Sequence, residues 1–183
     1  MILATLVLST LIAGILSPAV VRLGAAPWLT LLPVGLFVAF ATCLPEITAG
    51  GVMLESHAWI PSLGIYLSFR LDGLSLLFAL LITGIGTFIF LYSAWYLRGD
   101  SRQPRFFAFL TLFMGLMLGA VLADDLIAML VFWELTSVAS FLLIGHSAEQ
   151  AISRRAAQQG FLMTVAGGLV LLAGLILLGL VAG

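Results

Sequence analysis

Six long apolar runs constrain this chain more than any other feature of its sequence. A helix of about 20 apolar residues crosses a hydrocarbon core about 30 Å thick, and each run is close to that length. With 63% hydrophobic and 8% charged residues, the chain lacks the charge that a water-soluble surface of this size requires. We predict an all-α membrane protein, one transmembrane domain over residues 1–183, with six transmembrane helices at Ile2–Val21, Trp28–Leu44, Gly73–Leu97, Phe106–Ala123, Leu126–Gly145 and Phe161–Ala182.

The arginines predict which side of the membrane each loop faces, because cytoplasmic loops carry an excess of basic residues. The even-numbered loops hold only Arg70, whereas the odd-numbered loops hold Arg22, Arg98, Arg102, Arg105, Arg154 and Arg155. We therefore expect the odd-numbered loops on the cytoplasmic side and the N-terminus outside. The first run has no basic segment before it, so we expect a retained span rather than a cleaved signal.

The connection between the second and third runs differs from the others. Residues 45–72 contain a Gly-Gly pair, two prolines and the segment IYLSFRL. In that segment Ile65, Leu67 and Phe69 alternate with more polar residues, a pattern typical of a β-strand. We predict a short β-hairpin-like loop on the outer face of the membrane.

Glu134 is the residue that the rest of the chain does not explain. It lies in VFWELTSVASF, nine residues after Asp125 at the outer end of the fifth run. At 1.5 Å per residue this is a depth of roughly 13 Å, close to the midplane, where an ionisable side chain is costly and marks a functional site. No Lys, Arg or His of the chain falls at that depth. We predict that Glu134 takes part in proton translocation and that its partner lies elsewhere. The alternative is a neutral, hydrogen-bonded acid that joins two helices.

Four residues that follow Glu134 in the chain are candidates for a proton relay. Ser137 shares a helical face with Glu134, Ser140 lies nearby, and Thr136 pairs with Ser140 at i, i+4. His146 follows at the cytoplasmic end of the run, where its ordinary pKa suits proton entry. The alternative for His146, which its interfacial position favours, is a membrane-interface anchor.

Aspartates precede two helices on the outer side. Asp72 opens the third run, and Asp124 and Asp125 start the fifth, where a carboxylate caps the free N–H groups or favours the helix N-terminus. An ion contact at an outer mouth is the alternative role. We expect no metal site, because the two histidines fall in different compartments and neither CxxC nor HExxH occurs. The net charge of -1 gives no basic surface for nucleic acid.

Glycines mark the faces through which two of the runs are expected to pack. In the fourth run, GLMLG places Gly115 and Gly119 on one helical face as a GxxxG motif. The last helix carries Gly160, Gly167, Gly168, Gly174 and Gly179. We interpret both sets as packing surfaces, which indicate nothing about a substrate.

Three stretches together resemble one family. HAWIPSLGIYLSFRLDGLSLLFALLITGIG, LADDLIAMLVFWELTSVASFLLIG and SRRAAQQGFLMTVAGGLVLLAGL are similar to the antiporter-like membrane subunits of complex I and its relatives. The motif WELTS in the fifth run favours the large A subunit of Mrp-type multisubunit sodium/proton antiporters. The resemblance extends from about His57 onward, whereas the first 50 residues match only in apolar character.

The resemblance implies a larger fold of two inverted five-helix repeats, of which this chain would be an N-terminal fragment or half of a split protein. It implies that Glu134 corresponds to a fifth-helix glutamate facing a lysine on a seventh helix. It also implies other antiporter subunits, Na⁺ and H⁺ as partners, in the lipid bilayer of a cell membrane (in a prokaryote, the inner membrane). Asp125 and His146 depart from the asparagine and the aromatic residue that the family suggests.

Two other functions compete with a sodium/proton antiporter subunit. One is a proton-pumping subunit of complex I or a membrane-bound hydrogenase, with redox cofactors held only by its peripheral partners. The other is a purely structural membrane module, for which Glu134→Gln would change little. In all three cases we expect a chain that is not itself an enzyme and holds no cofactor.

Overall fold

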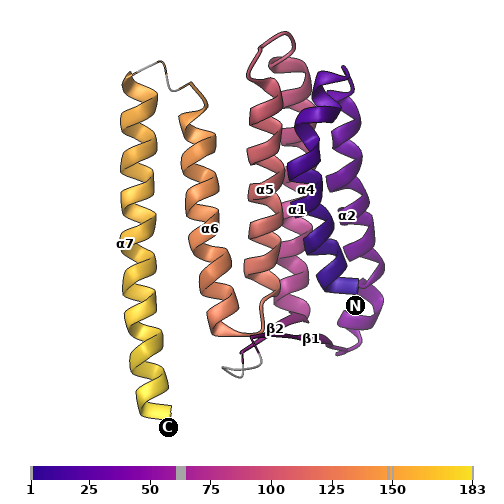
Figure 1. Cartoon of the computed structure of the whole chain (residues 1–183). Coiled ribbons are helices and arrows are strands. Elements are labelled where there is room, and N and C mark those ends of the chain that lie inside the picture. Colours follow the sequence, from indigo (N-terminus) through magenta and orange to yellow (C-terminus); the bar gives the residue numbers. More distant parts are fainter. Residues whose placement is uncertain (1, 61–64, 148, 150, 183) are drawn as a thin grey trace.

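Long helices run side by side through most of the chain, and a small β-hairpin crosses one end of them (Figure 1). The computed structural model describes residues 2–60, 65–147, 149 and 151–182. The elements, in order, are α1 (Ile2–Arg22), η1 (Ala26–Thr30), α2 (Leu31–Thr42), α3 (Leu44–Thr48), β1 (Met53–Ile60), β2 (Ile65–Leu71), α4 (Gly73–Tyr96), α5 (Gln103–Leu122), α6 (Leu126–Ile144), η3 (Gly145–Ser147) and α7 (Ala151–Ala182). Six helical segments within the described ranges are long and apolar enough to cross a membrane. The predicted fold class is confirmed.

Two helical boundaries differ from the predicted runs for clear chemical reasons. The second run is divided into η1, α2 and α3, and Pro27 and Pro45 stand in the first turns of η1 and α3. Proline fits a first turn because the N–H that it lacks would have no partner there. The last helix begins at Ala151 rather than Phe161, because the polar segment AISRRAAQQ consists largely of residues with good helix propensity.

The hairpin connects several helix ends on one side of the molecule. β1 and β2 pair antiparallel, with Glu55 opposite Phe69, whereas residues 61–64 lie outside the described part. The Glu55 carboxylate accepts from the backbone N–H groups of Leu3 and Ala4, both at 3.1 Å, and so caps α1 from a distant strand. The N–H of Asp124 donates to the carbonyl of Ser68 at 2.9 Å, which joins the hairpin to the α5–α6 connection.

Most of the buried side chains among the described residues lie on α1, α2, α4 and α5, which we call the core block. Its fully buried large side chains include Phe40, Phe90 and Phe107, and the last two rings meet edge to face at 5.7 Å.

Gly115 and Gly119 on α5 give close approach to two different helices. A Cβ at Gly115 would collide with Thr10 of α1, and one at Gly119 would collide with the Phe132 ring of α6. The GxxxG face therefore seats α5 between α1 and α6, as a packing surface should.

Candidate functional site

The Glu134 side chain lies between α6 and α7. Its carboxylate occupies the space beside Gly168, where a Cβ would overlap Oε1 and would lie 2.8 Å from Cδ and 3.4 Å from Oε2. Oε1 is buried and has no hydrogen-bond partner among the described residues. A buried carboxylate oxygen without a donor is costly, so it calls for a proton or for a cation from outside these helices.

The three hydroxyls of the predicted relay all donate to the backbone of α6 itself. Thr136 and Ser137 donate to the carbonyl of Trp133 at 2.6 Å and 3.3 Å, and Ser140 donates to the carbonyl of Ser137 at 3.0 Å. These bonds leave the hydroxyl oxygens as acceptors only. No hydrogen bond in the described ranges joins them to Glu134, so the relay remains a prediction.

His146 lies in η3, at the end of α6 opposite the hairpin. Its ring stands edge to face on Phe106, with the ring centres 5.2 Å apart, and both nitrogens are buried without a hydrogen-bond partner in the described part of the chain. Burial lowers the pKa of His146 below its ordinary value, and the neighbouring Arg102 guanidinium lowers it further. The ring therefore packs as a neutral aromatic group. Twelve residues, or about 18 Å of helix, separate it from Glu134.

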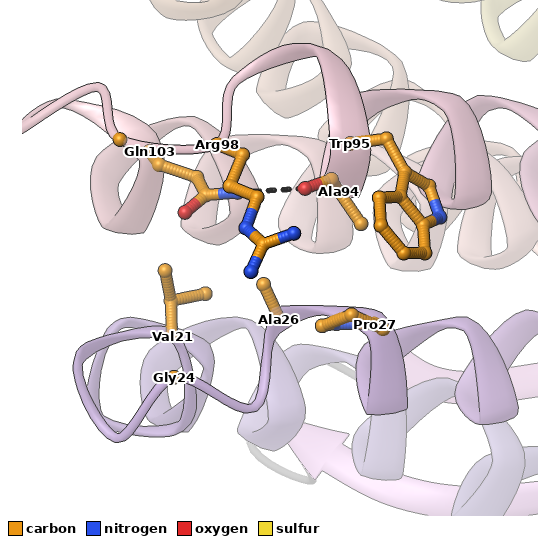
Figure 2. Close-up of a pocket in the computed structure, with 9 residues that line it drawn as sticks. Val21, Gly24, Ala26, Pro27, Ala94, Trp95, Arg98 and Gln103 are labelled. Atoms are coloured by element: carbon orange, nitrogen blue, oxygen red, sulfur yellow. Dashed lines mark hydrogen bonds between the residues drawn. The ribbon is translucent and has the colours of Figure 1, made fainter.

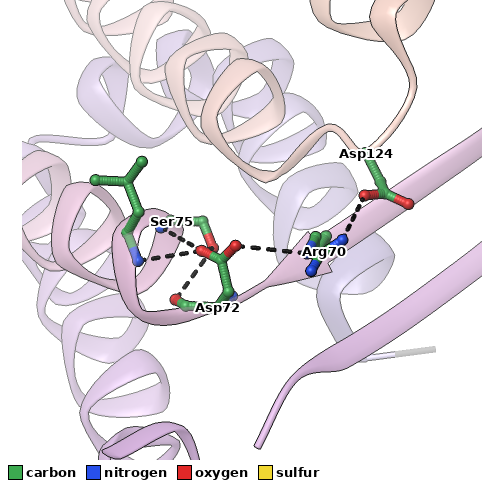
Figure 3. Close-up of polar contacts among 5 residues, drawn as sticks. Arg70, Asp72, Ser75 and Asp124 are labelled. Atoms are coloured by element: carbon green, nitrogen blue, oxygen red, sulfur yellow. Dashed lines mark hydrogen bonds and ion pairs between the residues drawn. The ribbon is translucent and has the colours of Figure 1, made fainter. Parts of the chain in front are cut away.

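Two of the aspartates singled out in the sequence, Asp72 and Asp124, meet at one cation on the hairpin side (Figure 3). Arg70 of β2 lies between them, with Nε 3.4 Å from Asp72 Oδ2 and Nη1 3.5 Å from Asp124 Oδ1. Asp72 also caps α4, because its side chain accepts from the N–H groups of Leu74 and Ser75 at 3.1 Å and 3.0 Å. The hydrogen bond from the Ser75 N–H is the leading cause that lowers the Asp72 pKa.

A cap role for Asp124 is wrong. The adjacent Asp125 is the N-cap of α6 and accepts from the N–H groups of Ile127 and Ala128, both at 2.9 Å. Asp124 is one residue before the N-cap position, and its own N–H donates to the carbonyl of Ser68 in the hairpin. Its ion pair with Arg70 is compatible with the outer-mouth alternative.

A cavity of about 350 Å³ lies at the other end of the core block (Figure 2). It separates the turn after α1 from the end of α4, where the Arg98 guanidinium lies 5.8 Å from the Trp95 ring centre. Gln103 Nε2 closes one wall by donating to the carbonyl of Ala94 at 3.2 Å. Among the described residues no acid or histidine lines this cavity, so they offer it no group for proton transfer at neutral pH. The same part of the chain contains no cluster of potential metal ligands.

The contact between Glu134 and Gly168 is the feature that sequence reasoning missed. The glycines of the last helix indicate packing surfaces, and nothing in their spacing indicates an acid between them. The depth of Glu134 follows from counting residues along one helix, but the face it presents depends on how α6 and α7 rotate against each other. The one available signal is the Gly167–Gly168 pair in the middle of the last helix, and this pair does not indicate which residue it contacts.

Two family models match separate parts of the chain, residues 59–107 and residues 123–183. Residues 59–107 match the model for NADH-ubiquinone oxidoreductase (complex I), chain 5 N-terminus. Residues 123–183 match the transmembrane model for NADH:quinone oxidoreductase/Mrp antiporter. The second match contains Glu134, Gly168 and the whole α6–α7 pair.

Two curated relatives give the same picture. The chain is 48% identical to the A subunit of the Na(+)/H(+) antiporter of Alkalihalophilus pseudofirmus, over 85% of this chain and 20% of the relative. It is 43% identical to the A/B subunit of a probable K(+)/H(+) antiporter of Rhizobium meliloti, over 80% of this chain and 15% of the relative. The chain thus spans a fifth or less of the length of these relatives.

Two solved structures share the fold. The Mrp complex from Dietzia sp. DQ12-45-1b matches with a TM-score of 0.84 and 32% identity, over 94% of this chain and 19% of that one. The membrane-bound sulfane sulfur reductase, an archaeal respiratory membrane complex, matches with a TM-score of 0.73 over 92% of this chain and 26% of that one. At 21% identity, the second likeness concerns the fold alone.

Proposed function

The chain belongs to the family of antiporter-like membrane subunits that complex I and Mrp-type antiporters share, and from this membership we propose that it forms part of the large A subunit of a multisubunit sodium/proton antiporter. The names of its relatives, which are A subunits of Na(+)/H(+) antiporters, support this function. We place it in the cell membrane, with the hairpin and the N-terminus on the outer side and the arginine-rich loops in the cytoplasm.

The single observation that carries a role for Glu134 is its buried, unpartnered Oε1 near the middle of α6, for which the described residues supply no donor. In this proposal Glu134 holds or releases a proton, and its charge acts on a cation supplied by a part of the protein beyond these helices. In keeping with the family resemblance, we propose that this cation is a lysine. Inward proton flow is thereby coupled to outward movement of sodium, and the protein catalyses no covalent chemistry.

A second candidate is a proton-pumping subunit of a redox complex. The complex I description of the model that matches residues 59–107 favours it. Here the carboxylate would serve the same proton path, but electron transfer in other subunits would drive it.

The test uses everted membrane vesicles that carry the complete protein in its native complex. We expect added sodium to dissipate a proton gradient in wild type, and Glu134→Gln to reduce that rate by at least about 100-fold, because an amide cannot exchange a proton. Glu134→Asp is the matched control that keeps a titratable group. If wild-type vesicles do not respond to sodium but build a proton gradient on NADH or hydrogen, the redox-pump proposal replaces the antiporter proposal. Full activity in Glu134→Gln, with equal assembly, would refute the role of Glu134.

A further inference from the structure

The carboxylate of Glu134 lies where α7 has no side chain. Five glycines fall within Ala151–Ala182, and they differ in what a Cβ would meet. At Gly167, Gly174 and Gly179 a Cβ would meet nothing within 4 Å, and at Gly160 it would make an ordinary contact of 3.7 Å with Ile144. Gly168 alone among them has its Cβ position filled, and the atoms that fill it are those of the Glu134 carboxylate.

We propose that Gly168 is a positioning residue for Glu134: the missing side chain forms a notch in α7 that seats the carboxylate at the depth where its proton is exchanged. This inference rests on the proposed function of Glu134 and extends it to the facing helix. Glycine is required here because its absent Cβ lets a neighbouring group approach the helix backbone closely.

Contacts toward the η3 end of the pair join the two helices. The rings of Phe141 and Phe161 lie 5.2 Å apart, two turns from the notch on each helix. Further on, a Cβ at Gly145 would make ordinary contact with Ala157, at 3.7 Å. A methyl group at position 168 therefore cannot be accommodated easily by parting the helices.

The flexible end of the Glu134 side chain is the part that can move. Oε1 and Cδ are the far end of a side chain with three rotatable bonds, so rotation can clear an added methyl group at little cost in stability. The helix pair then stays intact while the carboxylate leaves its place. A substitution at Gly168 should accordingly alter exchange much more than assembly, which distinguishes positioning from packing.

The adjacent glycine supplies a matched control. In everted vesicles with equal amounts of the assembled complex, we expect Gly168→Ala to lower sodium-driven proton exchange by about 10-fold, because a misplacement of about 1 Å at a reacting group has effects of this size or larger. Gly167→Ala adds the same methyl group one residue away in open space, and it should stay within about 2-fold of wild type. The pH optimum of exchange should shift in Gly168→Ala and not in Gly167→Ala.

A compensating change shows whether a defect in Gly168→Ala comes from displacement of the carboxylate or from general crowding between the helices. Aspartate is one methylene shorter than glutamate, so Glu134→Asp withdraws the carboxylate from the notch. Gly168→Ala combined with Glu134→Asp should then be at least as active as Glu134→Asp alone. If Gly168→Ala prevents assembly, the double variant should restore it.

Each contrary result has a distinct meaning. Equal activity in Gly168→Ala and Gly167→Ala, with Glu134→Gln inactive, would overturn the notch and leave the proposed function standing. A double variant that is less active than Glu134→Asp alone would also overturn it, because the methyl group would then disturb something other than the carboxylate. Full activity in Glu134→Gln would instead remove the function on which the inference rests.

Discussion

The core block and the α6–α7 pair differ in whether all of their described buried polar atoms have hydrogen-bond partners. In the core block the buried hydroxyls of Thr10, Thr83 and Thr111 each donate to a carbonyl of their own helix, at 2.6 to 2.7 Å. In α6 and η3, Glu134 Oε1 and both His146 nitrogens are buried with no partner in the described ranges. Because buried polar groups are normally satisfied, exceptions such as these, and His57 Nε2 in β1, mark where further chemistry is to be sought.

Packing follows the same division. Half of the most apolar stretch of α5 is buried, against 6% of that of α7. The core block is a closely packed helix bundle, sealed on one side by the hairpin. The α6–α7 pair holds the acid Glu134 near the middle of α6 and leaves most of its apolar surface exposed. Stability and transport should therefore respond to different substitutions.

The largest loss of stability should come from the interior of the core block. Phe90→Ala removes a ring that is 1% exposed and packs on Phe107, and we expect it to cost about 3 kcal/mol of unfolding free energy. Phe88→Ala, on the same helix, removes a ring that is 73% exposed and should cost no more than about 0.5 kcal/mol. Denaturant unfolding in detergent measures both. Equal losses would mean that α4 packs through another face.

A smaller loss should follow from removing the cap of α4. Asp72→Ala leaves the first N–H groups of α4 without their acceptor, and we expect a cost of about 1 kcal/mol at neutral pH. The pKa of Asp72 is lowered in the folded protein, so its contribution is present above the unfolded pKa and is lost as pH falls through the folded value. The difference in thermal midpoint between wild type and variant should shrink below about pH 4. A difference independent of pH would contradict this origin.

The smallest effect should be at His146 and should appear only in mild acid. Burial, with Arg102 and Arg105, lowers its pKa against the opposing charge of Asp100. The unfolded chain therefore binds a proton more readily, so the contribution is complete above about pH 6.5 and declines as pH falls through the folded pKa. His146→Phe should keep the ring contact with Phe106 and flatten this slope. Thermal midpoints measured across the window test it, and an unchanged slope would place the titrating group elsewhere.

The sequence predicted what depends on counting along one segment. Apolar length indicated the helices and alternation in IYLSFRL indicated β2, whereas the depth of Glu134, counted from Asp125, remains a prediction. These features depend on hydrophobic matching and backbone periodicity, which are local. The sidedness of the loops remains a prediction, since no membrane bounds the structure.

What the sequence could not predict depends on how separate segments meet. Glu55 and the start of α1 are about 50 residues apart, and neither segment contains a pattern that predicts their contact. The choice of Asp125 over Asp124 as the cap depended on where the hairpin pairs with the α5–α6 connection. The facing of Glu134 and Gly168 depended on the rotation of two helices. Tertiary contacts of this kind have no periodic signature.

The most direct test of this division measures proton exchange per assembled complex in two variants side by side. Glu134→Gln changes the acid of the α6–α7 pair that the described residues leave unsatisfied, and Thr111→Val changes a satisfied, buried hydroxyl of the core block. We predict that sodium-driven exchange in everted vesicles collapses in Glu134→Gln at wild-type levels of assembly, while Thr111→Val exchanges at the wild-type rate for each complex that assembles. Retained exchange in Glu134→Gln, or a collapse in fully assembled Thr111→Val, would contradict the separation of transport from stability.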